Sequence, residues 1–365
     1  MVTHIKSIGK IQLDEGAAAS GTREVAASGA RTMRSKDGGD SFSTYNGRMS
    51  DQLENIAFFC AGPGRGIRVG RAEDLSWLPP ESVDLVVTSP PYWNAVDYSK
   101  HSSGEEGWHR GAYSQGFATY SEYLDWWGQV CAEVARVLKP HGVFAFIVGT
   151  VRVDGQPFPV PQDLLVRANK VPLAYLDEIV WNKTTGGARR AGVYLQHPSA
   201  GYFYPNILAE YIYLLAKTDG EKWTPPWRDK SNAGPVIDDL FTREIANNVW
   251  HIAPVPPSST GHPAPYPAEI PHRLISLYSP IGGVVLDPMV GSGTTVHAAN
   301  ALGRLGIGSD IEENYVEIAR RNIARPYRRR SGQLVARYEK IDPGAVGMFR
   351  NRYSKSASKP RQKKK

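Results

Sequence analysis

Short apolar runs alternate with amphipathic stretches along the middle of this chain. Residues 83–88 form a run rich in β-branched side chains, and the run stops at Ser89-Pro90-Pro91, where a ladder of strand hydrogen bonds cannot continue. Residues 120–138 carry apolar side chains at nearly helical spacing, and a buried strand follows over 142–150. Further runs predict strands over 178–181, 211–216, 283–287 and 305–310, and helices over 294–302 and 313–325. The pattern predicts an α/β fold, with a doubly wound, mostly parallel sheet and helices on both faces.

The two ends of the chain lack this pattern. Residues 1–55 are rich in glycine, alanine and serine and poor in large apolar side chains, so we expect a disordered segment. Residues 339–365 form a basic tail, and the folded part is expected within 56–338. The proline-rich stretch 219–270 is expected to be irregular and to lie on the surface.

Composition excludes several classes of protein. The chain has 365 residues, of which 41% are hydrophobic, enough to bury a sizeable core. The longest nearly unbroken apolar run, residues 142–151, is too short to span a bilayer, and no secretory signal begins the chain. Two cysteines cannot form a disulfide framework, and nine histidines show no metal-ligand spacing, so no metal site is predicted. We expect a soluble protein of a reducing compartment, without a membrane partner.

Charge is unevenly distributed along the chain. Residues 325–365 contain fourteen Lys and Arg against two acids, a net charge of +12, so the rest carries −5 of the total of +7. This split favours a polyanionic partner held in part by the tail. A solvated tail that only aids solubility explains the charge equally well.

The first candidate site follows the predicted strand 283–287. Asp287 and Pro288 end the strand, Gly291-Ser292-Gly293 form a loop, and a helix begins at Thr294. The glycines let the backbone approach a ligand, and Asp287 can accept hydrogen bonds from a cationic group. Asp310 ends the next strand, where an acid can bind ribose hydroxyls. A cofactor with an ammonium group and a ribose is implied, which S-adenosylmethionine fits and for which NAD competes. A tight loop without a ligand is the plain alternative.

The second candidate site follows the strand 83–88. Pro90 and Pro91 fix the backbone, which orients the Ser89 hydroxyl and the Pro90 carbonyl, and Tyr92 supplies a flat ring for stacking. This combination suits the exocyclic amine of a planar base taken out of its stack, with Trp93 beside it. An ordinary turn at two prolines is the structural alternative.

Together the two motifs resemble those of the amino-group DNA methyltransferases that use S-adenosylmethionine. Ser-Pro-Pro-Tyr precedes Asp-Pro-x-x-Gly-Ser-Gly-Thr-Thr, and this order is similar to that of the circularly permuted β class. The resemblance covers residues 68–325. It also rests on residues 136–142, 179–183, 210–217, 249–252, 261–267 and 301–308.

The resemblance implies a seven-stranded sheet with one antiparallel strand. It also implies an enzyme that acts on double-stranded DNA in the cytoplasm of a bacterium or archaeon, or of a host cell where a phage encodes it. A cognate restriction endonuclease is a further implied partner. The implied parts are a catalytic half, a target-recognition region with one interleaved strand, and a cofactor-binding half, over residues 56–183, 184–260 and 261–338.

The resemblance also implies roles for single residues. Asp287, Pro288 and the loop from Gly291 to Thr294 resemble the methionine side of the cofactor pocket, which His262 closes, and Asp310 resembles the ribose-binding acid. Ser89, Pro90, Pro91 and Tyr92 resemble the catalytic tetrapeptide. Arg71 stands where family members often have Asp, so the adenine contact passes to Asp74, with Glu73 as the alternative.

Several interpretations of the target stay open. Serine at the first position of the tetrapeptide is, by resemblance, typical of cytosine-N4 enzymes, with adenine N6 as the alternative. Neither cysteine follows a strand in a Pro-Cys context, which disfavours attack on cytosine C5. Arg189 and Arg190 are candidates for DNA contact. Outside the class, a nicotinamide-dependent oxidoreductase and a non-catalytic DNA-binding protein remain as alternatives.

Overall fold

The computed structural model describes the part of the chain that carries the predicted sheet. The described residues are 66–93, 117–153, 156–183, 207–218, 220, 222–224, 239–256 and 259–329. Three predictions lie wholly outside them: the disordered segment 1–55, the tail 339–365, and the candidates Arg189 and Arg190.

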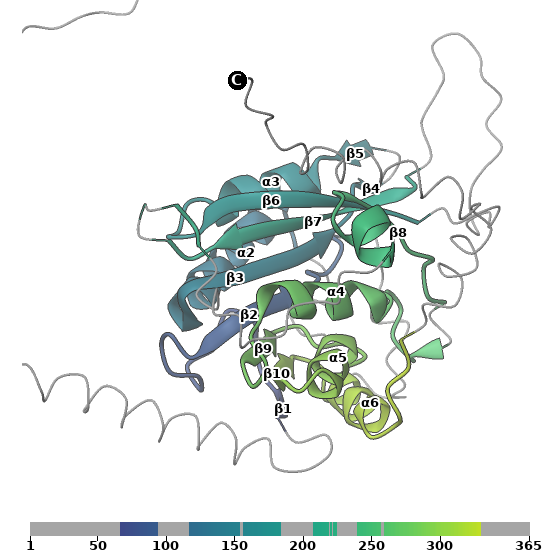
Figure 1. Ribbon diagram of the computed structural model, residues 1–365. Coiled ribbons are helices and arrows are strands. Elements are labelled where there is room, and N and C mark those ends of the chain that lie inside the picture. Colours follow the sequence, from purple (N-terminus) through teal and green to yellow (C-terminus); the bar gives the residue numbers. More distant parts are fainter. Residues whose placement is uncertain are drawn as a thin grey trace, which may run out of the picture. The chain divides into compact units, whose positions relative to one another are not determined.

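One mixed sheet forms the centre of the described fold (Figure 1). Its strand order is β1-β10-β9-β2-β3-β7-β6-β8, and every neighbouring pair is parallel except those that β7 makes with β3 and β6. In that order the strands are Ile67–Val69, Leu305–Asp310, Val284–Asp287, Val83–Thr88, Leu138–Val148, Ala209–Ala216, Ala174–Asn182 and Val249–His251. A small separate hairpin pairs β4, Val151–Val153, with β5, Gln156–Phe158. The predicted single antiparallel strand is therefore β7.

Helices cover both faces of this sheet (Figure 1). On one face lie α2, Tyr120–Val137, and α3, Val160–Ala168; on the other lie α4, Glu269–Tyr278, and α5, Thr294–Ala301. Helix α6, Glu313–Ile323, packs on α5 and β1, and a short π-helix, Phe241–Ile245, precedes β8. The doubly wound arrangement is confirmed. Within the described ranges, every helix is too short or too polar to cross a membrane.

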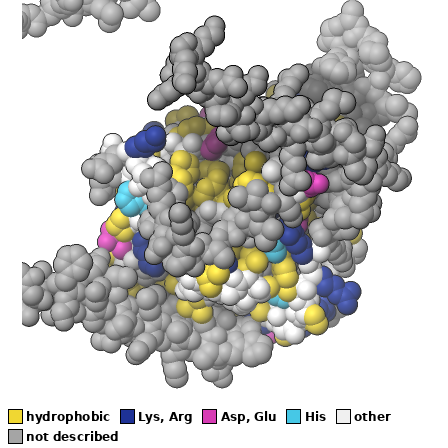
Figure 2. All heavy atoms as spheres, viewed as in Figure 1, with side chains coloured by type: hydrophobic (Ala, Val, Ile, Leu, Met, Phe, Trp, Pro, Cys, Tyr) yellow, Lys and Arg dark blue, Asp and Glu magenta, His cyan; other side chains and the backbone are white. Residues whose placement is uncertain are grey.

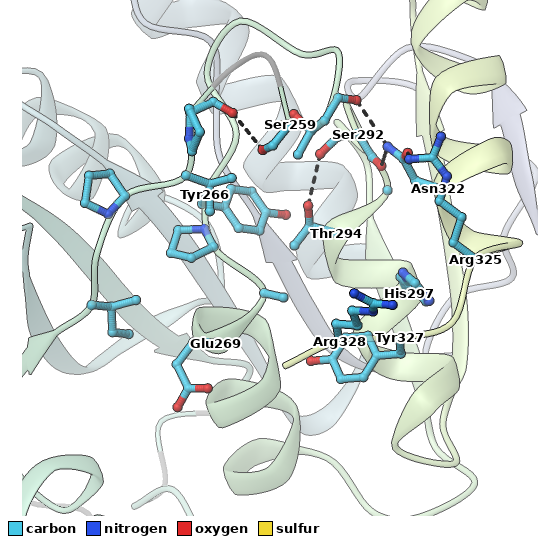
Figure 3. A pocket seen from close by; sticks show the side chains of 18 of the residues that line it. Ser259, Tyr266, Glu269, Ser292, Thr294, His297, Asn322, Arg325, Tyr327 and Arg328 are labelled. Atoms are coloured by element: carbon cyan, nitrogen blue, oxygen red, sulfur yellow. Dashed lines mark hydrogen bonds between the residues drawn. The ribbon is translucent and has the colours of Figure 1, made fainter. Parts of the chain in front are cut away.

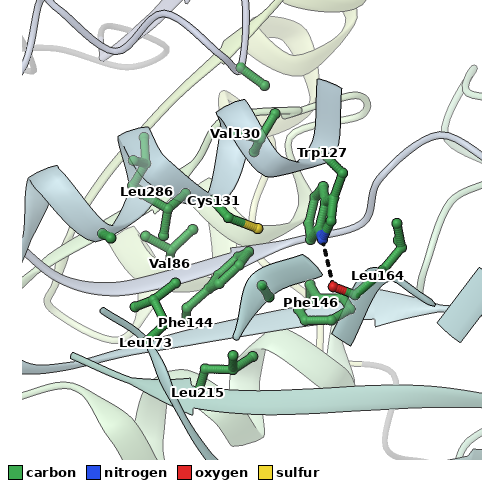
Figure 4. Close-up of a cluster of buried hydrophobic side chains, with 14 of the residues drawn as sticks. Val86, Trp127, Val130, Cys131, Phe144, Phe146, Leu164, Leu173, Leu215 and Leu286 are labelled. Carbon is green, nitrogen blue, oxygen red and sulfur yellow. Dashed lines mark hydrogen bonds between the residues drawn. The ribbon is translucent and has the colours of Figure 1, made fainter. Parts of the chain in front are cut away.

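Alternation along the strands divides the core into two layers. On β3, Phe144 and Phe146 face α2, whereas Val143, Ala145 and Ile147 face α4. In the first layer Trp127 packs on both phenylalanines, and its indole N–H donates to the Leu164 carbonyl at 3.1 Å (Figure 4). Cys131 of α2 lies in this layer, and burial raises the pKa of its thiol.

The sheet has eight strands in the described residues, so the predicted number of seven is wrong. Neither β1 nor β8 was among the strands located from the sequence, and β8 lies within the stretch 219–270 that was expected to be irregular and to lie on the surface. Trp250 at its centre is fully buried, and residues 180–182 of β6 pair with 249–251. Burial of one large indole orders this three-residue strand, which is too short for periodicity to reveal.

The join between α2 and β3 also differs from the prediction. The helix was predicted over 120–138 and the strand over 142–150, but β3 begins at Leu138, directly after the helix. The register against β2 shifts between Val83 and Leu85, so the extra residues are accommodated as an irregularity within the strand pair.

Candidate active site

The two motifs found in the sequence meet at one edge of the sheet. Strands β2 and β9 are parallel neighbours although about 200 residues separate them, so their carboxyl ends lie side by side. The Thr88 hydroxyl, the last of β2, donates to Oδ1 of Asp287, the last of β9, at 2.7 Å. Ligands of open α/β sheets bind at this edge. The structure therefore brings the predicted catalytic motif and cofactor loop together.

Asp287 lies fully buried between these two motifs. Its Oδ2 accepts a hydrogen bond from the Tyr266 hydroxyl at 2.8 Å, and its Oδ1 accepts one from the Met289 N–H at 3.2 Å. Burial raises the pKa of the Asp287 carboxyl to about 7, although the bonds from Thr88 and Tyr266 favour its ionised form. Both oxygens thus already have donors within the protein, and contact with a ligand cation stays a prediction.

Asp310 holds the cofactor loop from the neighbouring strand. Its Oδ2 accepts from the Gly291 N–H at 2.8 Å, and its Oδ1 accepts from the Glu312 N–H at 3.1 Å. Burial raises the pKa of this carboxyl to about 6. Gly291 has a φ of +48°, and a Cβ there would lie 3.0 Å from Nε2 of His262. The ring of His262 therefore lies against the glycine loop, and its contact with the cofactor stays a prediction.

Side chains from other elements fasten the catalytic tetrapeptide. The Ser89 hydroxyl donates to the Ile147 carbonyl at 2.9 Å, and the Tyr123 hydroxyl donates to the Pro91 carbonyl at 3.1 Å. The Tyr92 hydroxyl donates to Oε1 of Glu210, at the start of β7, at 2.6 Å. Strands β3 and β7 and helix α2 thus fix the motif that follows β2.

Two acceptors in the tetrapeptide remain for a ligand amine. Because Ser89 gives its only hydroxyl proton to Ile147, its oxygen faces any further group as an acceptor. Within the described part of the chain, no hydrogen bond is made to the Pro90 carbonyl. A planar amine carries two N–H donors, so the two acceptors suit it.

A cavity of about 850 Å³ adjoins the cofactor loop (Figure 3). Three predicted cofactor residues line it at the start of α5: Ser292, Gly293 and Thr294. Tyr266 also lines the cavity, and Asn322 of α6 donates to the Ser292 carbonyl at 3.0 Å. Its other lining residues come from the loop after β8, the start of α4, helix α5 and the chain after α6 (252–256, 259–260, 267–269, 297, 325–328).

The cavity favours an anionic group at its helical end. The first N–H groups of α5 point out of that helix, and its macrodipole places partial positive charge there. Hydroxyls of Ser292 and Thr294 lie 3.0 Å apart beside it, and the exposed Arg325 and Arg328 belong to the rim. Figure 2 shows Lys and Arg side chains gathered beside α6 on this face. Asp287, Asp310 and His262 do not line the cavity itself.

Three other predicted residues have partners that the sequence did not show. Trp93 is buried against Tyr120 and Phe158, so its contact with DNA stays a prediction. Glu73 accepts from Arg71 at 2.6 Å and from the Trp126 indole at 3.0 Å. Asp74 is exposed, and hydrogen bonds from the side chain and the N–H of Ser76 lower the pKa of its carboxyl. Both acids follow β1, whose partner β10 ends at Asp310, and the contact of either with the cofactor stays a prediction.

Sequence reasoning missed the side chains that hold these motifs in place. Tyr266, Glu210 and Lys183 each lie in a stretch that carried the resemblance, yet none received a role. The available signal was a charged residue beside a run of apolar strand residues, as at Lys183 after residues 179–181 of β6 and Glu210 near the start of β7. Periodicity cannot say which side chains such residues meet.

Comparison with known proteins agrees with this geometry. A family model described as DNA methylase, N6_N4_Mtase, matches residues 83–321. The type II methyltransferase M.ScaI of Streptomyces caespitosus is 30% identical over 254 residues, which cover 68% of this chain and 77% of that protein.

Two solved structures share the fold. TTHA0409 of Thermus thermophilus, complexed with S-adenosyl-L-methionine, superposes with a TM-score of 0.52 at 29% identity, over 71% of this chain and 92% of that one. The PvuII DNA methyltransferase (cytosine-N4-specific) has a TM-score of 0.52 at 20% identity, over 75% and 91% of the two chains. With the family model matching well over half of the sequence, the chain belongs to the N6/N4 family of DNA methylases.

Proposed function

We propose that this chain methylates the exocyclic N4 of cytosine in a base extruded from double-stranded DNA. As a family member it is an S-adenosylmethionine-dependent DNA methyltransferase. The observation that carries the finer proposal is Ser89, whose hydroxyl donates to Ile147 and so presents an acceptor at the end of β2. By resemblance, serine at this position is typical of cytosine-N4 enzymes.

The residues at the sheet edge fit the parts of S-adenosylmethionine. Asp310 offers carboxylate lone pairs to the ribose hydroxyls, and the start of α5 with Ser292 and Thr294 suits the methionine carboxylate. Asp74 or Glu73 is the candidate for the adenine amine. When bound, the cofactor supplies an activated methyl group on a sulfonium, and the protein chiefly orients and desolvates the reacting groups.

The tetrapeptide then prepares the attacking amine. Ser89 Oγ and the Pro90 carbonyl accept its two N–H groups, which leaves the nitrogen lone pair directed out of the base plane. Tyr92 stacks on the base and holds that plane. Orientation of this kind is worth several orders of magnitude in rate. The nitrogen loses its extra proton to solvent after transfer, so no strong base is required at the outset.

Adenine N6 is the second candidate target. The family model that matches the chain is named for both N6 and N4 methylases, and an acceptor pair beside a stacking ring serves either amine. A nicotinamide-dependent oxidoreductase is not compatible with membership in this family. A non-catalytic DNA-binding protein would bind DNA without methyl transfer.

The permuted β class and the restriction-modification setting belong to this proposal. Along the chain the catalytic strand β2 precedes the cofactor strand β9, which is the order that the permuted class predicts. Residues 184–260 are the proposed target-recognition region, into which β7 and β8 are interleaved. A cognate endonuclease is the proposed partner.

The test is incubation with unmethylated genomic DNA and isotope-labelled cofactor, followed by nucleoside mass spectrometry. Labelled N4-methylcytosine is expected. Labelled N6-methyladenine would overturn the N4 assignment within the same family chemistry. DNA binding without any labelled nucleoside would overturn the enzymatic proposal itself.

A further inference from the structure

Two opposite charges lie buried at the edge of the sheet beside the tetrapeptide. Lys183 follows β6, and Glu210 is the second residue of β7. Their side chains are only 8% and 6% exposed, and the ammonium group bonds Oε1 of the carboxylate. Both residues lie in stretches that carried the family resemblance but received no function.

The same carboxylate oxygen accepts the Tyr92 hydroxyl at 2.6 Å. The chain also makes room for Glu210 at this point, because Gly149, just past the end of β3, has no side chain. A Cβ on Gly149 would lie 2.9 Å from Cγ of Glu210. Three segments, after β2, β3 and β6, therefore converge on the start of β7.

The ion pair is not required to join its own two strands. The backbone already pairs them, with Trp181 opposite Glu210 and the Lys183 N–H donating to the Leu208 carbonyl at 2.9 Å. Desolvation of two buried charges costs free energy that their attraction only partly returns. The contact that the strand ladder cannot supply is the one to Tyr92, which lies on a separate loop.

We propose that Glu210 and Lys183 are positioning residues that fix the ring of Tyr92 against the target base. Glu210 holds the phenol, and Lys183 compensates the charge of Glu210 so that the carboxylate can stay buried. The proposal rests on the stacking role of Tyr92 in the proposed function, and it applies equally to a cytosine and an adenine target.

Its test is a double-mutant cycle of Tyr92→Phe and Glu210→Gln in the full chain. The substrate is a duplex containing a site that the wild-type protein methylates, so a failure of the proposed function is seen first, in the wild type. Tyr92→Phe keeps the ring but removes the donor. Each single variant should lower turnover about 10- to 100-fold, the scale of a misplaced reacting group, with the cofactor Kd within twofold of wild type.

Non-additivity is the decisive outcome. If Glu210 acts through Tyr92, the double variant should be no slower than the slower single variant. Multiplied losses would overturn the proposal. The matched control is Glu81→Gln, which removes the carboxylate of another Lys–Glu pair, 3.1 Å from Lys217 and away from the motif. Its turnover should equal that of wild type, and a loss like that of Glu210→Gln would contradict a positioning role.

A further variant, Lys183→Met, tests whether Lys183 compensates the charge of Glu210. Lys183→Met leaves Glu210 buried and uncompensated, and we expect the largest loss of turnover from it. Adding Glu210→Gln should recover at least tenfold, because it removes the buried charge that Lys183→Met leaves uncompensated. Fluorescence of 2-aminopurine at the target position should follow turnover, since a loose Tyr92 holds the extruded base poorly. No recovery in the double variant would overturn the role of Lys183.

Discussion

Two buried carboxylates lie along one edge of the sheet and are held in different ways. Asp287 accepts from two hydroxyls, those of Thr88 and Tyr266, and from one backbone N–H. Glu210 accepts from one hydroxyl, that of Tyr92, and pairs with the ammonium group of Lys183. Asp287 joins the cofactor loop to β2, whereas Glu210 joins the tetrapeptide to β7.

The difference shows that neutral hydrogen-bond donors can fix the position of a buried carboxylate without keeping its pKa low. Around Asp287 they fix the geometry but do not outweigh desolvation, so the pKa of that carboxyl rises to about 7. Around Glu210 a full positive charge lies in contact with the carboxylate. We therefore expect the Asp287 region to respond to pH, and the Glu210 region to respond to loss of its partner.

The largest effect on stability is expected from Glu210→Ala. It leaves Lys183 as an uncompensated buried charge, and breaking a buried pair costs about 3–5 kcal/mol. Denaturant unfolding measures this loss directly. Glu81→Ala is the control, because its pair with Lys217 is partly solvated and exposed pairs contribute about 0–1 kcal/mol. Equal losses in the two variants would contradict the distinction.

The second-largest effect is expected in the pH dependence of stability, to which Asp287 should contribute. Its pKa is raised from 3.8 to about 7 in the folded state, so the folded protein binds more protons than the unfolded chain between these values. Stability from this group is fully present below about pH 4 and is lost as pH rises through 7, by an amount on the order of a few kcal/mol. Asp287→Asn removes the titration.

The comparison is the free energy of unfolding from pH 4 to 8 for wild type and Asp287→Asn. The wild-type curve should fall more steeply with pH than that of the variant, and the two should differ most at and above pH 7. Parallel curves would mean that Asp287 titrates in the folded state as it does in the unfolded chain.

A smaller effect is expected from Tyr266→Phe. The variant removes one hydroxyl from Asp287 and leaves a buried acceptor with one donor fewer, at a cost of about 1–3 kcal/mol. It should also raise the pKa of Asp287 further, because the lost bond favours the ionised form. Thermal unfolding at two pH values measures both changes. A variant as stable as wild type at pH 8 would show that the Tyr266 bond contributes nothing.

Much of the fold could be predicted because its central strands are continuous runs of apolar residues. Strands 83–88 and 305–310 were predicted to the residue, since burial on both faces leaves a continuous apolar signature. Helix α4 was missed because it begins inside the proline-rich stretch; Pro271 lies in its first turn, where a missing N–H costs nothing. Strand β8 is ordered by tertiary burial of Trp250, which no local pattern records.

The candidate site was only half readable for a similar reason. Ser89, Asp287 and Asp310 follow strands in recognisable motifs, so their positions at one sheet edge could be inferred. The bonds from Thr88 to Asp287 and from Tyr92 to Glu210 depend on which strands become neighbours and in what register. Residues separated by 199 and 118 positions give no local sign of such contacts.

The central claim is that the end of β2 holds the target amine while the ends of β9 and β10 hold the cofactor. Ser89→Ala tests it most directly, with turnover and cofactor Kd measured side by side on the same preparation. Turnover should fall by about 10²–10³, the scale of losing one preorganised hydrogen-bond partner, while the cofactor Kd stays within twofold of wild type. Retained turnover with collapsed cofactor binding would contradict the account.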